Sequence, residues 1–251
     1  MLLLAVCCGL AAACTQRQER LKLMSYNIRN GIGIDNIQDI GRIARVILRE
    51  APDLVALQEL DSATLRVDGR YIPGELGRMT GMHATFGRAI GFAGGSYGIG
   101  LLSRTEPLAV RSIPLPGREE ARVLLMAEFP DYTVCITHLS LTPEDRLASL
   151  PIIREATDTC RKPVLLAGDF NTGNAAAVLA GLGGGFRILS DTTRMTFPSD
   201  NPAVRIDYIL GRGLPTSATV AESAVDHTAT ASDHCPLWVT LVWKRGKQPG
   251  K

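Results

Sequence analysis

Polar residues able to bind a metal ion or a phosphate group recur where apolar runs of the sequence end. These residues are Asn27, Glu59, His138, Asp169 with Asn171, Asp207, and Asp233 with His234. A single Asn or Asp after a strand is most often a turn former, and a single His in a strand most often packs half-buried. The recurrence along one chain instead favours a shared site at the ends of several strands.

The residue types in this set define its chemistry. Carboxylate and amide oxygens without a thiolate cluster select a hard cation, Mg²⁺ or also Mn²⁺, over zinc. Mg²⁺ uses one or two protein carboxylates and completes its shell with water and substrate phosphate oxygens. Imidazoles add phosphate donors or proton-transfer groups near neutral pH, and a neighbouring Asp fixes the tautomer of a His. Together these groups supply what the in-line attack of water on phosphorus requires.

Alternating strand and helix signals position these residues. Helical periodicity over 36–50 places Ile37, Ile40, Ala44, Ile47 and Leu48 on one face, and Pro52 follows it. A second helix over 142–157 has Thr142 as N-cap and Pro143 at its first position, and Pro151 is expected to kink or split it. A third helix is expected over 175–182. Strands are expected over 21–28, 53–60, 96–104, 121–129, 132–139, 163–171, 205–211, 217–223 and 235–243.

Composition indicates one domain over residues 21–245, followed by a C-terminal tail over 246–251. The chain has 251 residues, 45% of them hydrophobic, and a net charge of +2, which does not favour nucleic-acid binding by charge alone. Strands occur in runs and also alternate with helices, which predicts an α/β (α+β) sandwich of packed sheets with helices on the outer faces. Cys135, Cys160 and Cys235 form neither a disulfide framework nor a zinc motif, and a monomer is expected.

The first fourteen residues, "MLLLAVCCGLAAAC", form an uncharged apolar run that is too short to span a membrane. Such a run is typical of an export signal, and small residues before Cys14 resemble a bacterial lipoprotein box. We therefore expect a lipid on Cys14, a short tether over 15–20 and a location in the bacterial cell envelope. Two alternatives stay open, a plain signal peptide and a buried N-terminal segment.

The motifs "SYNIRNG", "ALQEL", "THL", "GDFN", "RIDYIL" and "SDHCP" occur in this order over residues 25–236. In this arrangement the chain resembles the endonuclease/exonuclease/phosphatase superfamily of metal-dependent phosphoesterases. This superfamily includes DNase I-like nucleases, exonuclease III-like enzymes, bacterial sphingomyelinases and inositol polyphosphate 5-phosphatases. The resemblance implies a four-layer α/β sandwich, with two packed mixed sheets flanked by helices and the active site at one rim.

The resemblance also implies roles for individual residues. Glu59 would be the principal Mg²⁺ ligand, with Asn27 and Asp233 on the metal side. Asp169 would orient or deprotonate the attacking water, and Asn171 would hold a phosphate oxygen. His234, oriented by Asp207, would contact the scissile phosphate, and His138 would be a phosphate donor or leaving-group acid.

The sequence departs from the motifs of some members of the superfamily, which helps to decide which members it resembles most. In DNase I-like members an acid supports the second histidine, and this sequence offers Ile99 near that position. Arg104 and Arg122 could reach a phosphate, whereas His83 and His227 match no motif. The flanks "LAGDFNTGN" do not match the inositol phosphatase pattern.

We therefore expect an exported phosphodiesterase acting on nucleic acid or on phospholipid head groups. The alternative is a phosphomonoesterase acting on sugar, inositol or other small phosphates. A more remote alternative is a binding protein with a degenerate site.

Overall fold

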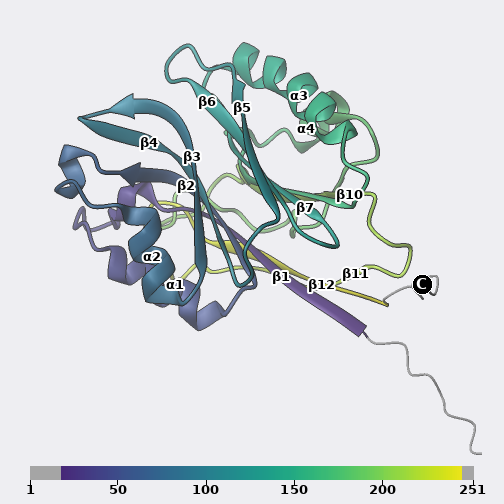
Figure 1. Cartoon of the computed structure of the whole chain (residues 1–251), viewed down its shortest axis with the longest axis horizontal. Helices are drawn as coiled ribbons and strands as arrows, with labels where there is room; N and C mark the ends of the chain where they lie inside the picture. The colour runs from purple at the N-terminus through teal and green to yellow at the C-terminus, as the bar shows by residue number, and fades with distance from the viewer. Residues whose placement is uncertain (1–17, 245–251) are drawn as a thin grey trace, which may run out of the picture.

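Two six-stranded β-sheets form the centre of the structure, a computed structural model that describes residues 18–244 (Figure 1). The first sheet has the order β11-β12-β1-β2-β4-β3, and the second has the order β5-β6-β7-β8-β10-β9. The strands of the first sheet are β1 Gln18–Asn27, β2 Leu54–Ser62, β3 His83–Phe92, β4 Gly95–Ser103, β11 Thr219–Val225 and β12 Leu237–Lys244. Those of the second are β5 Ala109–Leu115, β6 Arg122–Glu128, β7 Thr133–His138, β8 Val164–Asp169, β9 Arg187–Ile188 and β10 Asp207–Arg212.

Four helices cover the outer faces of the sheets, so that the chain forms four layers. These helices are α1 Ile40–Glu50, α2 Ile72–Thr80, α3 Pro143–Asp158 and α4 Ala175–Leu182. The first two lie on one side of the molecule and the last two on the other (Figure 1). Short 3-10 helices follow β1 and β2, at Arg29–Gly31 and Leu65–Val67. The expected four-layer sandwich of two mixed sheets is confirmed.

Strands buried on both faces explain why their sequences are almost continuously apolar. In β1, Leu21 and Leu23 pack into the core between the sheets, whereas Met24 and Tyr26 pack under α1 and α2. A third cluster joins α3 and α4 to the outer face of the second sheet. This two-sided burial follows from the alternation of side chains along a strand.

Each sheet contains one parallel pair, and this pairing brings the polar strand ends together. Strands β1 and β2 are parallel, with Asn27 opposite Gln58, and β7 and β8 are parallel, with His138 opposite Asp169. The carboxyl ends of parallel strands lie at the same sheet edge, where open α/β sheets commonly bind ligands. Strand β10 runs antiparallel to β8 and begins with Asp207 opposite Asp169. One rim of the sandwich therefore collects polar residues from both sheets.

Two of the expected helices differ in detail from the structure. Helix α1 begins after Asp39, whose side chain accepts a hydrogen bond from the Gly41 amide at 2.8 Å. Its buried face is Ile40, Ile43, Ala44, Val46 and Ile47, so the assignment of Ile37 and Leu48 to that face was wrong. Ile37 precedes the helix and is 60% exposed, and Leu48 is 51% exposed.

Helix α3 runs from residue 143 to residue 158 through Pro151, so of the two expected effects of this proline, a kink or a split, the split does not occur. Thr142 occupies the N-cap position but makes no capping hydrogen bond to the helix. Its hydroxyl donates to Glu119 at 3.1 Å instead.

The sequence did not predict α2, β3 or β5, all of which belong to the region between Asp61 and Leu115. The first residues of the described chain, Gln18–Arg20, lie in β1 and pair with β12, although they were assigned to the tether. The expected signal peptide with Cys14 and the expected tail at 246–251 lie outside the described residues. Between residues 18 and 244, no helix is both long and apolar enough to cross a membrane.

Candidate active site at one rim of the sandwich

Asn27 lies at the centre of the polar rim and contacts groups from both sheets. Its amide nitrogen donates to Glu59 Oε1 at 3.0 Å and to Asp169 Oδ2 at 3.2 Å, and it lies 3.5 Å from His234 Nε2. Its side-chain oxygen Oδ1 accepts the backbone N–H of Arg29 at 3.1 Å. The Arg29 contact orients the amide, so that Asn27 holds two carboxylates as a donor.

Glu59 reaches the rim because β2 is irregular at this point. The β2–β4 register shifts between Leu57 and Leu60, which marks a β-bulge. Glu59 lies in this bulge with a φ of 57°, a conformation that most residues avoid. Gln58, beside it, is fully buried, whereas Glu59 is only partly buried. The bulge therefore presents the Glu59 carboxylate at the open end of the sandwich.

Asp169 is a buried carboxylate shared by several polar groups. Its Oδ2 atom lies 3.5 Å from His138 Nε2 and 3.7 Å from His234 Nε2. Its Oδ1 atom accepts the backbone N–H of Asn171 at 2.8 Å. The Asn171 side chain in turn donates to the Leu139 carbonyl at 2.8 Å, which links the end of β8 to the end of β7.

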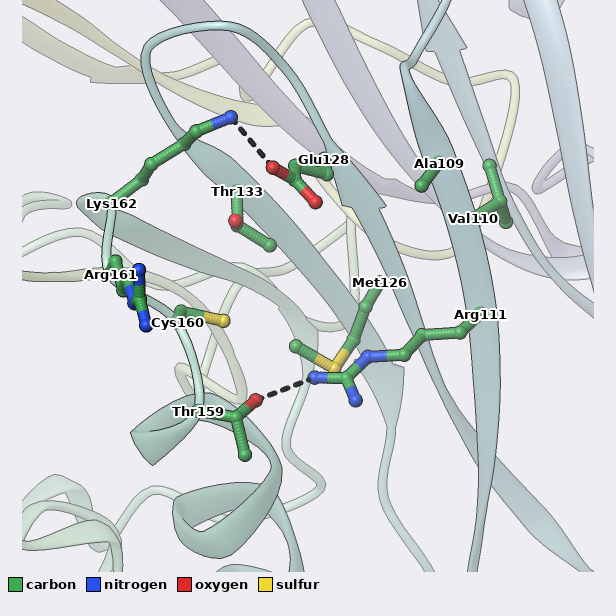
Figure 2. A pocket seen from close by; sticks show the side chains of 10 residues that line it. All are labelled: Ala109, Val110, Arg111, Met126, Glu128, Thr133, Thr159, Cys160, Arg161 and Lys162. Atoms are coloured by element: carbon green, nitrogen blue, oxygen red, sulfur yellow. Dashed lines mark hydrogen bonds and ion pairs between the residues drawn. The ribbon is translucent and has the colours of Figure 1, made fainter.

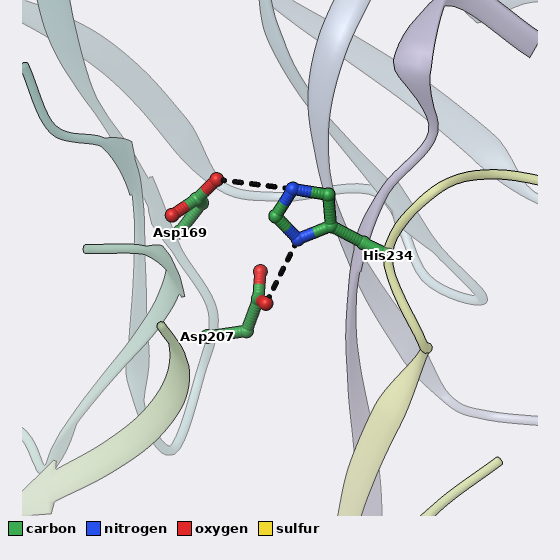
Figure 3. A group of neighbouring side chains, drawn as sticks. All are labelled: Asp169, Asp207 and His234. Carbon is green, nitrogen blue, oxygen red and sulfur yellow. Dashed lines mark hydrogen bonds and ion pairs between the residues drawn. The ribbon is translucent and has the colours of Figure 1, made fainter. Parts of the chain in front are cut away.

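His234 joins the two sheets through Asp207. The imidazole Nδ1 lies 2.9 Å from Asp207 Oδ2, and Figure 3 shows the ring between the carboxylates of Asp169 and Asp207. Buried Thr196 accepts the backbone N–H of Asp207 at 3.3 Å through its hydroxyl. The ring of Phe197 packs beside the imidazole, with 4.8 Å between the centroids. The predicted Asp207–His234 pair is therefore present, and neighbouring residues fix its position.

Burial and nearby charges shift the pKa values of His234 and His138 in opposite directions. Burial lowers the pKa of His234, but the hydrogen bond and charge of Asp207 outweigh this effect and raise that pKa to about 10. Burial and the nearby Arg122 guanidinium hold the pKa of His138 well below its usual value. Burial, with added repulsion from Asp207, raises the pKa of Asp169. At neutral pH the rim thus presents a cationic His234 and a neutral His138.

Asp233 lies at the exposed side of the rim. Its Oδ2 atom is 3.5 Å from Arg29 Nε, and both side chains are about one-third exposed. Ser232 is fully buried, and its hydroxyl donates to the backbone carbonyl of Asn27 at 2.7 Å. The sequence did not indicate a role for Arg29 or Ser232, although both belong to the motifs "SYNIRNG" and "SDHCP". The assignment of Asp233 to the metal side stays a prediction.

The structure places Ile99 near His138, where DNase I-like members have an acid that supports the second histidine. Ile99 and His138 line the same small cavity of about 10 Å³, which Glu120 and Arg122 also line. Position 99 is therefore close to this histidine but offers no carboxylate. Arg122 is 6% exposed and pairs with Glu119 and Glu120, so that of the two candidate arginines it is the one beside the rim.

Arg104 and His83 lie at the end of the first sheet that is far from the rim. Arg104 follows β4 at the opposite end of the sheet, where its Nε lies 3.9 Å from Asp53 Oδ1, so the suggestion that it reaches a phosphate at the site was wrong. His83 begins β3 opposite Ser103, at the same far end. His227 contacts the Met195 carbonyl at 2.9 Å.

Two groups of side chains can be weighed as a metal site. Asp169, Asp207 and His234 have one potential ligand atom each within 4.8 Å of one another. Both imidazole nitrogens already face carboxylates, so a cation among these three would disrupt the His234–Asp207 hydrogen bond. Glu59 instead offers a partly exposed carboxylate with room for water ligands, which fits the coordination habits of Mg²⁺. The donor set of the rim therefore fits a hard divalent cation bound through Glu59.

A larger hollow of about 480 Å³ lies at the opposite end of the second sheet (Figure 2). It lies between the start of β5 and the segment after α3, and none of the rim residues lines it. Three of its four charged residues make local contacts: Arg111 donates to Thr159 at 3.0 Å, and Lys162 lies 2.6 Å from Glu128. The chemistry of the rim does not extend to this hollow.

Comparison with known proteins agrees with the geometry. The model of the endonuclease/exonuclease/phosphatase family matches residues 24–234. The structure of an endonuclease/exonuclease/phosphatase from Beutenbergia cavernae is 24% identical, with a TM-score of 0.70, and the match covers 90% of this chain and 72% of that chain. No curated protein matches the sequence significantly.

Two further solved structures with the same fold have more specific descriptions. A mannosyl-6-phosphatase of Bacteroides thetaiotaomicron is 19% identical, with a TM-score of 0.70 and coverage of 88% of this chain and 99% of that chain. D. rerio TDP2 in complex with a single-strand DNA product is 22% identical, with a TM-score of 0.67 and coverage of 88% and 98%. At this identity the two structures establish a shared fold only. The family match spans most of the sequence, and the chain therefore belongs to the endonuclease/exonuclease/phosphatase family.

Proposed function

We propose that the protein is a Mg²⁺-dependent phosphodiesterase that hydrolyses its substrate by in-line attack of water. The observation that carries this proposal is the arrangement around Asp169 Oδ2, which faces the amide of Asn27 and the imidazoles of His138 and His234. Members of this family are phosphoesterases, so the chemical class follows from membership. The choice of Mg²⁺ rests on the oxygen ligands that the site offers. The choice of a diester rests on His138, which resembles the second histidine of the DNase-like and sphingomyelinase-like branches of the family.

Glu59 would hold the metal ion, with Asn27 supporting its carboxylate through the 3.0 Å hydrogen bond. Asp233 would be available on the same exposed side once freed from Arg29. A bound Mg²⁺ would neutralise phosphate charge and polarise the ester. Mn²⁺ has similar ligand preferences and is expected to substitute for it.

Side chains of the rim would each have a separate role in hydrolysis. Asp169 is buried and has a raised pKa, which suits a carboxylate that accepts a proton from the attacking water. His234, held as a cation by Asp207, would donate hydrogen bonds to the phosphate as negative charge develops. Asn171 and the neutral His138 would position further phosphate oxygens or the leaving group.

The substrate is proposed from the rim and the composition together. A net charge of +2 does not favour a nucleic-acid substrate, because nucleases commonly use a basic surface to follow the phosphate backbone. Nucleic acid and phospholipid head groups are both retained as candidate diesters. The alternative is a phosphomonoesterase acting on a sugar, inositol or other small phosphate. An inactive binding protein is disfavoured because the described rim retains every expected catalytic side chain.

Export is part of the proposal and rests on the sequence alone. The apolar segment over 1–14 and the small residues before Cys14 favour a lipoprotein of the bacterial cell envelope. Lipidation of Cys14 would make the membrane a partner of the protein. Mass spectrometry of the protein from its own host tests this, because an intact Met1 in the envelope fraction contradicts it.

The test of activity compares two soluble substrates, bis(p-nitrophenyl) phosphate and p-nitrophenyl phosphate. Each is incubated with Mg²⁺ and with EDTA, using the wild-type protein and Asp169→Ala. We expect metal-dependent cleavage of the diester that the variant lacks. Cleavage of the monoester alone would establish the phosphatase alternative.

A further inference from the structure

A carboxylate outside the predicted catalytic set contacts the chain segment that follows His138. Both oxygens of Glu119 accept the Ser140 hydroxyl, at 2.7 and 2.8 Å. Oε1 also accepts the Leu141 backbone N–H at 2.7 Å, and Oε2 accepts the Thr142 hydroxyl at 3.1 Å. One side chain from the loop before β6 therefore fixes three consecutive residues after β7.

The segment that Glu119 fixes also supports the catalytic groups of the second sheet. His138 is two residues before Ser140, and its Nε2 lies 3.5 Å from Asp169 Oδ2. The intervening Leu139 donates its N–H to the Asp169 carbonyl at 2.9 Å and accepts the Asn171 side chain at 2.8 Å. Movement of this segment would therefore displace His138 and Asn171 together.

Glu119 also connects the segment to the cation beside His138. Its Oε1 atom lies 3.4 Å from an amino nitrogen of Arg122, whose side chain is almost fully buried. Arg122 and His138 line the same small cavity. The hydrogen bonds from the segment outweigh the effect of burial and lower the pKa of Glu119 to about 2, so the carboxylate stays charged at neutral pH.

A plain structural role would require only that the loop be attached to α3, and a neighbouring ion pair already does this. Arg118 donates its backbone N–H to Asp145 Oδ2 at 2.7 Å and its guanidinium to Asp145 Oδ1 at 3.0 Å. Neither residue contacts the segment over 138–142 through the described hydrogen bonds. Glu119 differs because its partners continue directly to the catalytic residues.

We propose that Glu119 is a positioning residue, which holds residues 140–142 and Arg122 so that His138 and Asn171 keep their places at the rim. This inference rests on the proposed phosphodiesterase activity, and it adds to the site a residue that contacts neither substrate nor metal.

The test compares Glu119→Ala with Glu119→Gln and with the matched control Asp145→Ala. The amide of Gln keeps the shape of the side chain and can still bond the Leu141 N–H and the hydroxyls, whereas Ala removes every contact. We expect Glu119→Ala to lower kcat on bis(p-nitrophenyl) phosphate by about 10- to 100-fold, the scale of loss for a displaced catalytic group. Glu119→Gln should keep kcat within about threefold of wild type. Asp145→Ala should also keep kcat within about threefold, although it should lose about as much thermal stability as Glu119→Ala.

A second readout separates positioning from activity. The imidazole NMR signals of His138 should shift in Glu119→Ala and stay in place in Asp145→Ala, whether or not the assay substrate is cleaved. Equal kcat values in Glu119→Ala and Asp145→Ala, or unchanged His138 signals, would overturn the proposal. If the wild-type protein cleaves no phosphodiester but the His138 signals shift as expected, the proposed function fails while the positioning role stands.

Discussion

The imidazole Nδ1 of His234 lies 2.9 Å from Asp207 Oδ2, although the two residues belong to different sheets. Asp207 begins β10 in the second sheet, and His234 precedes β12 in the first. The hydrogen bond therefore closes the sandwich at the rim and also sets the charge of the histidine.

Replacement of Asp207 by Asn should lower the pKa of His234, which Asp207 raises to about 10 against the effect of burial. A folded-state pKa raised above 6.5 contributes stability that is complete below pH 6.5 and is lost as the pH rises through about 10. The free energy of unfolding of the wild-type protein should thus fall across this range, and less so in Asp207→Asn. NMR titration of His234 and urea unfolding in EDTA measure both effects. An unchanged His234 pKa in the variant would contradict this interpretation.

Asp169→Asn should remove activity without weakening the fold. Loss of a proton acceptor typically costs about 10²- to 10⁴-fold in turnover. Burial and the Asp207 charge make an ionised Asp169 unfavourable, so the neutral amide should leave the thermal midpoint unchanged or raise it. Turnover and thermal unfolding of the same preparation test the prediction. A strong drop in the midpoint would show that the carboxylate is needed for stability.

Glu59→Gln should weaken metal binding more than Asp233→Asn does. The amide oxygen of Gln can still accept the Asn27 hydrogen bond, so the fold of the rim is retained while the ligand charge is lost. We expect Mg²⁺ affinity to fall in Glu59→Gln by at least the about 10- to 100-fold that loss of a residue supporting a metal ligand costs, and higher Mg²⁺ to restore part of its activity. Isothermal titration calorimetry with Mg²⁺ measures the affinity. A larger loss in Asp233→Asn would move the principal ligand to Asp233.

Gly168→Ala should disturb the spacing between His138 and Asp169. A Cβ atom at Gly168, where φ is 154°, would lie 1.9 Å from the Thr137 carbonyl oxygen in the paired strand. Strand β7 or β8 would have to shift, at a cost of about 1–3 kcal/mol or more. Gly173→Ala is the matched control, since the nearest atom there is 3.7 Å away. Urea unfolding and turnover should both decline in the first variant, and equal behaviour of the two variants would rule out this steric argument.

Cys235 should be unreactive although it follows His234 directly. Burial, with a contribution from the Asp207 charge, raises the pKa of its thiol to about 12, so almost none is thiolate at neutral pH. Among the cysteines of the described chain, Cys160 is half-buried and should be the one that iodoacetamide labels. Cys235→Ala should keep activity within a few-fold of wild type. Rapid labelling of Cys235, or a large loss in the variant, would indicate a role for the thiol.

The strand ends were predictable because apolar runs that stop at a polar residue leave a local signal. Asn27, Asp169 and His234 meet at the rim as expected, although Asn27 and Asp169 are 142 residues apart in sequence. The bulge at Glu59 was not predictable, because "ALQEL" reads as a regular strand and the irregularity arises from pairing with β4.

Glu119 and Ser232 were missed for a related reason. A single Glu in a loop and a single Ser before an Asp have many ordinary uses, and only the folded chain shows which atoms they contact. Strand β3 was missed because its glycines interrupt the strand signal and its burial is only partial.

The direction of β1 determines how the proposed lipoprotein would face its membrane. The strand has 10 residues from Gln18 to Asn27, about 30 Å of extended chain, and it ends at the polar rim. Cys14 precedes Gln18 by four residues, which span at most about 14 Å. This tether is shorter than the strand, so an enzyme attached through Cys14 could not invert to point its rim at the same bilayer. The rim would instead face the aqueous space, so that the molecule would capture phosphate esters that arrive by diffusion and leave the head groups of its own membrane intact.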